Sequence, residues 1–279
     1  MAIQRVSSKW AKTKVLLRDS HITRYVPLTL KYSRNALGEM LNQHSLVYIK
    51  PDTGTYGNGV MCVERLHEPE NIHSNHDQDE SEGNVAEHYR LNFVTSSEEF
   101  SSLDDLHKAI RARTHQKLYL LQQGIPKLKF RDRSFDLRVL TQKTPYGSWE
   151  TTGIIGRVAA KNKIITNYHS GGTIGMLDDL LKEHASPGQI NALERELYAL
   201  GVDTAKQLQK DYPRLKEIGL DIALGSDLYP WILEVNTLPA IFPFKKFFKD
   251  KSVYRRIERY AVAYGRLSAP AKGRSKTKT

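Results

Sequence analysis

The sequence lacks several features that would assign it to a specialised class. Its 279 residues contain a single cysteine, Cys62, which excludes a disulfide scaffold and any zinc or iron–sulfur site built from several cysteines. No apolar run reaches the roughly 18 residues of a membrane span, and the first residues lack the long apolar segment of a signal peptide. A protein of the reducing cytoplasm is therefore expected.

Evenly spread positive charge is also missing, because the charge lies in blocks. The net charge is +11, yet residues 64–105 hold twelve acidic and two basic residues, and residues 245–279 hold twelve basic and two acidic ones. An even basic field would favour a nucleic-acid partner, so this distribution argues against such a partner. Residues 67–90 are expected to form an irregular acidic insertion, and residues 267–279 a disordered basic tail.

Hydrophobic patterning predicts an α+β fold with a strand-rich centre. Helices are expected at residues 28–43, 101–113, 186–212 and 251–264. Strands are expected at residues 46–50, 60–63, 118–122, 134–142, 149–159, 163–167, 218–224 and 231–235. These elements do not alternate strand and helix, so a doubly wound parallel sheet fits poorly.

A glycine-rich segment joins two of the expected strands. The sequence VYIKPDTGTYGNGV places Gly54, Gly57 and Gly59 shortly after Lys50. Glycines let a backbone approach a ligand closely and offer amide donors to phosphate. The spacing matches neither a Walker loop, nor a kinase glycine loop, nor a dinucleotide fingerprint. A plain hairpin turn is the alternative interpretation.

Two carboxylates and an amide in GLDIALGSDLYPWILEVN form a candidate metal site. Asp221 and Glu234 lie on two expected strands joined by a turn, and Asn236 shares a strand face with Glu234. Such oxygen ligands suit Mg²⁺. The alternative is a hairpin with solvated acids, but Glu234 interrupts an apolar run and needs a partner. Without metal, at least one carboxylate is expected to have a raised pKa through mutual repulsion.

A third group of polar residues occupies the strand-rich centre. Asp136 and Arg138 share one face of the strand expected from SFDLRVLTQ, and Arg157 interrupts the small and apolar run TTGIIGRVAA. Arg157 is either an edge residue with a solvated head group or a cation aimed at an anion. Asn167 follows shortly before a second glycine pair, which suggests a turn near the same site.

Taken together, these segments resemble the ATP-grasp superfamily, and more closely the endospore coat-associated YheC/YheD family. The resemblance runs from about residue 8 to residue 266 and is carried by SKWAKTKVLLRDSHITRYVPLT, VYIKP, LYLLQQGIP, FDLRVL, TTGIIGRVA, NYHSGG, GLDIAL and WILEVNTLP. Each motif is weak alone, but their order and spacing are specific. Family members usually carry a further N-terminal domain, most of which this chain is expected to lack.

The resemblance implies ATP bound between two lobes, residues 1–115 and 116–266. It assigns the phosphates to Lys9, Lys50 and the loop glycines Gly54, Gly57 and Gly59, and adenine to a hinge at Gln122, Gln123 and Ile125. It also places Asp136 and Arg138 at the nucleotide, and Mg²⁺ at Asp221, Glu234 and Asn236. Arg157, assisted by Asn167, would steady the transferring phosphoryl group and the tetrahedral adduct.

The implied activity is ATP- and Mg²⁺-dependent joining of a carboxylate to an amine through an acylphosphate. No protein nucleophile is needed for this chemistry, which agrees with the lack of a Ser/His/Asp or Cys/His arrangement. The alternative is a nucleotide-binding spore-coat protein with little or no turnover. Spore-coat proteins are possible partners on either interpretation, and the residues do not identify the carboxylate or the amine.

Overall fold

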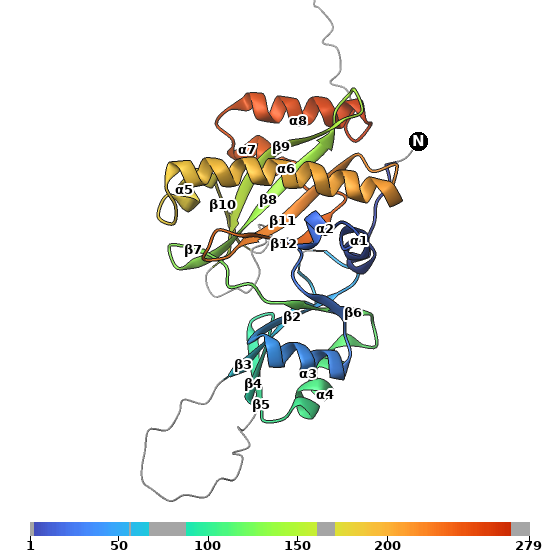
Figure 1. The fold of residues 1–279 in the computed structure, drawn as a ribbon, viewed down its shortest axis with the longest axis vertical. Helices are drawn as coiled ribbons and strands as arrows, with labels where there is room; N and C mark the ends of the chain where they lie inside the picture. The colour runs from blue at the N-terminus through green and yellow to red at the C-terminus, as the bar shows by residue number, and fades with distance from the viewer. Residues whose placement is uncertain (1–2, 56, 67–87, 161–170, 269–279) are drawn as a thin grey trace, which may run out of the picture.

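Two antiparallel sheets build the protein, one in each half of the ribbon (Figure 1). The computed structural model describes residues 3–55, 57–66, 88–160 and 171–268. The first sheet has the strand order β1-β6-β2-β3-β4-β5, and the second has the order β10-β9-β8-β11-β12, with β7 paired to β8. The α+β class expected from the patterning is therefore confirmed.

The first sheet is covered on one face by two helices. Its strands are β1 Thr29–Lys31, β2 Leu46–Pro51, β3 Met61–Leu66, β4 His88–Phe93, β5 Ser96–Phe100 and β6 Tyr119–Gln123, and its helices are α3 Arg34–Gln43 and α4 Leu103–Thr114. Val47 and Ile49 pack against α3 and α4 in the core. Because side chains alternate along a strand, Tyr48 and Lys50 project from the opposite face.

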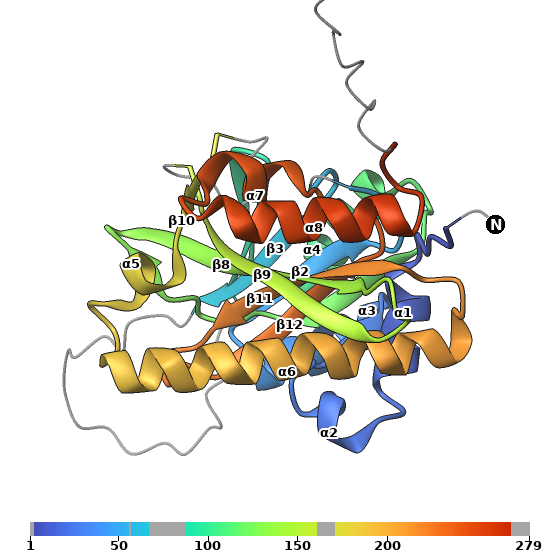
Figure 2. The ribbon, with the colours of Figure 1, turned by 90° about the horizontal axis from the view of Figure 1, so that it is seen from above.

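The second sheet carries helices on both faces, as Figure 2 shows from above. Its strands are β7 Lys129–Phe130, β8 Arg133–Lys143, β9 Trp149–Val158, β10 Thr173–Gly175, β11 Glu217–Leu224 and β12 Pro230–Asn236. The helices are α5 Leu177–Leu181, α6 Pro187–Asp211, α7 Phe242–Phe247 and α8 Lys251–Ala263. Val139 packs into the core beneath α6, and its neighbour Leu140 packs into the core beneath α7 and α8.

Local sequence signals account for the longest helix. Ser186 caps α6 through a reciprocal capping box with Gln189, and Pro187 occupies the first turn. The buried stripe of α6 holds apolar residues at helical spacing: Ile190, Leu193, Leu197, Leu200 and Leu208. α6 therefore lies flat on the second sheet and holds the polar strand residues in place from behind.

Two segments do not follow the expected division into lobes after residue 115. The short helices α1 Lys9–Leu16 and α2 Ser20–Thr23 bury Val15, Leu16 and Ile22 in the core of the second sheet. β6, beyond residue 115, pairs with β1 and β2 in the first sheet. The limits of the two lobes stay a prediction, but chain order alone does not separate the sheets.

Three expectations about elements need correction. The helix expected at 28–43 was wrong at its start, because residues 29–31 pair with β6 as β1 and Ser33 caps a helix that begins at Arg34. The irregular insertion expected at 67–90 includes the start of β4, while residues 67–87 are outside the described part of the chain. Leu267, assigned to the tail, packs against the core under α8.

The strand expected at 163–167 and the remainder of the tail, from residue 269, are outside the described residues. Within the described part of the chain, no helix has the length and apolar character that crossing a bilayer requires.

Candidate functional site

A cavity of about 550 Å³ lies between the two sheets. The first sheet contributes side chains from β2 and the glycine-rich loop after it, and the second contributes side chains from β8, β9, β11 and β12. Ile174 on β10, residues 238–240 and the first two residues of α7 form a further part of the wall. Most residues singled out in the sequence therefore converge on this one cavity.

Strand register explains how the polar residues of the second sheet meet. Asp221 on β11 lies opposite Glu234 on β12 and opposite Arg138 on β8. Asp136 on β8 lies opposite Arg157 on β9. Directly paired residues of antiparallel strands share one face of the sheet, and this face is turned to the cavity. The facing carboxylates expected from the hairpin pattern are present in the fold.

Arginines and aspartates form a nearly buried cluster on this face. Arg157 Nε donates to Asp136 Oδ1 at 2.7 Å, and Arg157 Nη2 lies 3.0 Å from Asp221 Oδ2. Arg138 Nε donates to the other oxygen of Asp221 at 2.6 Å. The side chains of Asp136 and Arg157 are only 4% and 13% exposed. Arg157 is thus a buried, paired cation, and not an edge residue with a solvated head group.

The arginines reverse the rise in pKa that repulsion between carboxylates would give Asp221. Burial alone would raise the pKa of Asp221, but the charges of Arg138 and Arg157 and their hydrogen bonds hold that pKa below its usual value. The expectation of a raised pKa is therefore wrong for Asp221. Repulsion between carboxylates would raise the pKa, but β8 and β9 place Arg138 and Arg157 against Asp221, and these contacts were not predicted from the sequence.

The first sheet presents lysine to the cavity in a different setting. Lys50 Nζ donates to Gln122 Oε1 at 2.5 Å, and Gln122 Nε2 donates to the carbonyl of Leu233 at 3.2 Å. Burial lowers the pKa of Lys50 to about 8, although the negative charge of Glu234 opposes that shift. A neutral amide thus orients the Lys50 ammonium.

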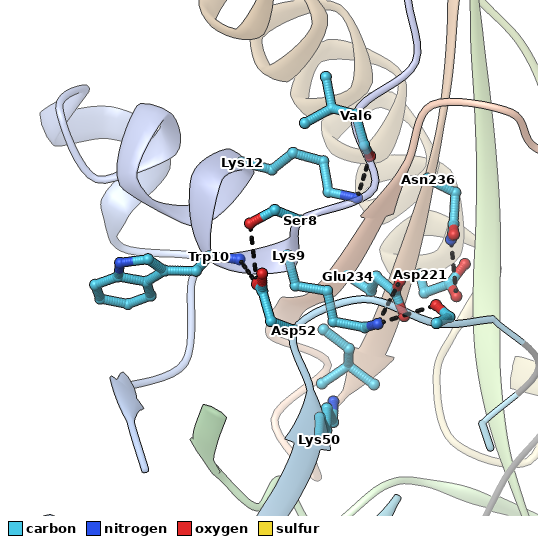
Figure 3. A network of polar contacts seen from close by, with 12 residues as sticks. Val6, Ser8, Lys9, Trp10, Lys12, Lys50, Asp52, Asp221, Glu234 and Asn236 are labelled. Atoms are coloured by element: carbon cyan, nitrogen blue, oxygen red, sulfur yellow. Dashed lines mark hydrogen bonds and ion pairs between the residues drawn. The ribbon is translucent and has the colours of Figure 1, made fainter. Parts of the chain in front are cut away.

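The start of α1 connects the glycine-rich loop to the second sheet (Figure 3). Asp52 Oδ1 accepts hydrogen bonds from Ser8 Oγ at 3.0 Å and from the Trp10 amide at 2.7 Å. Lys9 Nζ donates to the carbonyl of Gly54 at 3.2 Å and lies 3.7 Å from Glu234 Oε1. Lys9 therefore contacts the loop on one side and the candidate metal hairpin on the other.

The loop and hinge residues reach the cavity only in part. Gly54, Gly57 and Ile125 line it, and Gly59 lies just behind, where a Cβ atom would come within 2.8 Å of the Tyr119 hydroxyl. Gly59 also has a φ of +75°, so this position favours glycine on two counts.

The two hinge glutamines do not line the main cavity. Gln122 borders a smaller adjoining hollow, and the Gln123 side chain accepts from the amide of Leu28 at 3.3 Å. Gln122 therefore reaches the site through Lys50, and Gln123 braces the hinge. The other candidate, Asn167, is outside the described residues.

Two further charged residues, Lys127 and Asp52, belong to the site and were not predicted from the sequence. Lys127 lines the cavity, with its Nζ 4.0 Å from Asp136 Oδ2, and Asp52 anchors the start of α1. Burial lowers the pKa of Lys127, against the opposing charge of Asp136. Lys127 follows the hinge directly in Gly-Ile-Pro-Lys, and Asp52 follows Lys50 in Lys-Pro-Asp, so proximity to motifs already selected was the available signal.

The oxygen donors fit Mg²⁺ presented together with a nucleotide. Asp221, Glu234 and Asn236 line the cavity, and Asn236 donates through its nitrogen to Asp221 at 3.3 Å, which leaves its carbonyl oxygen for a cation. Across the described residues, no group of three or more His, Cys, Asp or Glu side chains could hold a metal ion. A bound Mg²⁺ would therefore complete its shell with phosphate oxygens and water.

Comparison with known proteins assigns the chain to a family. A family model described as YheC/D-like ATP-grasp matches residues 2–267, so the chain belongs to that family. The family and the ATP-grasp fold expected from the sequence are thereby confirmed.

Two curated relatives come from Bacillus subtilis (strain 168). Endospore coat-associated protein YheD is 25% identical over 240 residues, which cover 83% of this chain and 48% of the relative. Endospore coat-associated protein YheC is 26% identical over 235 residues, which cover 83% of this chain and 59% of the relative. The chain spans less than two thirds of either relative.

Among solved structures, the ADP complex of N5-carboxyaminoimidazole ribonucleotide synthetase aligns with a TM-score of 0.46 at 10% identity. That alignment covers 85% of this chain and 46% of the other chain.

Proposed function

We propose that this ATP-grasp protein is an ATP- and Mg²⁺-dependent ligase that joins a carboxylate to an amine. One observation carries the proposal: five cationic and three anionic side chains line a single cavity between the sheets, an excess of two positive charges. Such an excess in a partly enclosed site suits a polyanionic ligand such as a nucleoside triphosphate.

In this proposal the residues divide the nucleotide between them. Lys9, Lys50 and the loop glycines bind the phosphates, and Ile125 contacts the adenine. Glu234 and Asn236 hold Mg²⁺ together with Asp221, and Mg²⁺ neutralises charge on the phosphates during transfer. Arg138, paired with Asp221, keeps that carboxylate oriented.

The proposed reaction has two steps. A substrate carboxylate oxygen attacks the γ-phosphorus of ATP, the bond to the bridging oxygen breaks, and ADP leaves. An amine then attacks the acylphosphate carbon, phosphate leaves with the transferred carboxylate oxygen, and the amine nitrogen loses a proton. Arg157 stabilises negative charge as it develops in both steps. The protein itself forms no covalent intermediate.

An isotope experiment tests this sequence of bond changes. The protein is incubated with ATP, Mg²⁺, pooled amines and amino acids or peptides whose carboxylates carry ¹⁸O, and the released phosphate is analysed by mass spectrometry. The proposal expects one ¹⁸O atom in each phosphate released together with an amide product. Phosphate without label would mean that water, and not the carboxylate, receives the phosphoryl group.

A second function is favoured by the state of Asp221. Both of its carboxylate oxygens already have partners. Oδ1 accepts a hydrogen bond from Arg138, and Oδ2 pairs with Arg157 and accepts a hydrogen bond from Asn236. A nucleotide-binding protein of the endospore coat, with little or no turnover, would retain such a closed cluster. The names of the two relatives supply the coat association. ATP binding without phosphate release across broad substrate pools would support this second function over the first.

A further inference from the structure

One wall of the cavity is apolar directly beside Arg157. Ile155 precedes Arg157 by two residues on β9, and Ile174 on β10 is the register partner of Arg157. The three side chains therefore share one face of the sheet, and all three line the cavity. Leu238, in the segment before α7, and Phe242, the first residue of α7, extend this apolar wall, and α7 contacts β10.

The wall includes large apolar side chains that remain exposed to solvent. Phe242 is 56% exposed and Leu238 is 43% exposed. The other large hydrophobic side chains that are exposed in the described part of the chain do not line this cavity: Leu17, Leu28, Val94, Leu118 and Tyr146. Apolar surface inside a concave, otherwise charged site is a feature of ligand pockets, where a ligand covers it.

A second apolar surface of the cavity, separate from the wall beside Arg157, can hold the nucleotide base. Tyr48, Ile125 and Leu233 line the cavity from β2, the hinge and β12. β12 and β10 are the opposite edges of the five-strand path in the second sheet. Four strand spacings separate them, roughly 19 Å at about 4.8 Å each. A base at Leu233 would therefore leave the wall beside Ile174 uncovered.

We propose that the acid substrate is a carboxylic acid with an apolar side chain, a specificity that rests on the ligase function proposed above. The carboxylate lies toward Arg157, and the side chain covers Ile174, Leu238 and Phe242. The net positive charge of the cavity favours the carboxylate, and the adjacent apolar wall favours a side chain that gives up water on binding. An acid with a second charged group would have to desolvate that charge against the wall.

A matched series of acids tests this specificity by binding alone. Calorimetry measures acetate, butanoate, hexanoate, 3-phenylpropanoate and succinate against the full chain saturated with ADP and Mg²⁺. We expect affinity to rise by up to about fourfold for each added methylene group, and succinate to bind no better than acetate. Phe242→Ser and Leu238→Ser should each weaken hexanoate severalfold and leave acetate and ADP unchanged. Leu17→Ser, at a residue of similar exposure outside the cavity, should change none of these affinities.

Three results would overturn the inference. The first is an affinity series that is flat with chain length, and the second is a preference for succinate. The third is an equal loss of ADP affinity in Phe242→Ser, which would assign the wall to the nucleotide. Phosphate release, followed in parallel, separates this inference from the ligase function. Release with polar acids alone would remove the apolar specificity and keep the ligase, whereas length-dependent binding without release would keep the apolar site and remove the ligase.

Discussion

The two sheets present positive charge to the same cavity in opposite ways. On the first sheet, Lys50 donates to the neutral amide of Gln122. On the second sheet, Arg138 and Arg157 donate to buried carboxylates. A cation held by a neutral partner keeps its charge for a ligand, whereas a cation paired inside the fold is compensated before any ligand arrives. We infer that the first sheet supplies affinity for phosphate and that the second supplies a fixed electrostatic frame.

The largest expected effect comes from breaking the arginine–aspartate frame. Arg157→Met should destabilise the fold by about 3–5 kcal/mol, because it leaves Asp136 and Asp221 buried with a lost partner. Arg18→Met is the control, since Arg18 pairs with Asp211 but is 55% exposed, and it should cost about 0–1 kcal/mol. Urea denaturation measures both changes. Equal losses would show that burial does not distinguish the two ion pairs.

The next largest effect is expected from removing the positive charge of Lys50 on the first sheet. Lys50→Met should weaken ATP binding about tenfold, or about 1.4 kcal/mol, even in EDTA, because the ammonium meets phosphate directly. Stability should not fall, since the substitution also removes a buried charge. Lys12→Met removes another buried lysine, one that does not line the main cavity, and should leave ATP affinity unchanged. Calorimetry on both variants decides whether Lys50 contacts the nucleotide.

The pH dependence sharpens the same contrast. Burial lowers the pKa of Lys50 to about 8, so this ammonium is lost as the pH rises through that value. ATP affinity should then decline toward the roughly tenfold loss expected of Lys50→Met. The free energy of unfolding should instead rise between pH 8 and the ordinary lysine pKa of 10.5. In that range the unfolded chain binds more protons than the folded chain.

Lys12 separates the two effects of pH, because burial also lowers its pKa to about 8. Lys12→Met should lose part of the rise in stability and keep the decline in ATP affinity. Lys50→Met should lose the decline in affinity. Calorimetry and denaturation between pH 7 and pH 10 measure both trends. A decline that survives in Lys50→Met would assign the titration to another group.

The smallest expected effect concerns the link between the two sheets at the start of α1. Asp52→Asn removes a negative charge at this helix N-terminus and should cost about 0.3–1 kcal/mol. ATP affinity should fall slightly as well, because Asp52 holds the segment that carries Lys9. Asp250→Asn, at the cap of α8, should cost similar stability with no change in ATP affinity. Matching affinities in the two variants would limit Asp52 to a structural role.

Patterns within short segments predicted much of this molecule from the sequence. The hairpin of β11 and β12 was predicted with its facing acids, because alternation fixes which side chains share a face. Helix α6 was predicted from its capping box and its leucine stripe. Both features depend on residues close together in the chain.

Features that depend on distant pairing were not predictable in the same way. Residues 29–31 lay within a range expected to be helical, but pairing with β6 places them in a strand. The contacts of Asp221 with Arg138 and Arg157 join three separate strands, so no single motif revealed them. Asp52 meets Ser8 across 44 positions of the chain. The residues of the site could thus be listed from the sequence, but the charge each one retains depends on the fold.

In the proposed function ATP and Mg²⁺ bind together between the two sheets, and a thermal-shift matrix tests this joint binding. The melting temperature is measured with ATP in Mg²⁺ or in EDTA for wild type and for Glu234→Gln. Glu99→Gln, on the exposed strand β5, is the control. Through binding linkage, ATP should stabilise wild type and Glu99→Gln strongly in Mg²⁺ and weakly in EDTA. Glu234→Gln should lose most of that difference and keep its melting temperature without ligand. If Glu234→Gln retains the wild-type dependence on Mg²⁺, the claim is contradicted.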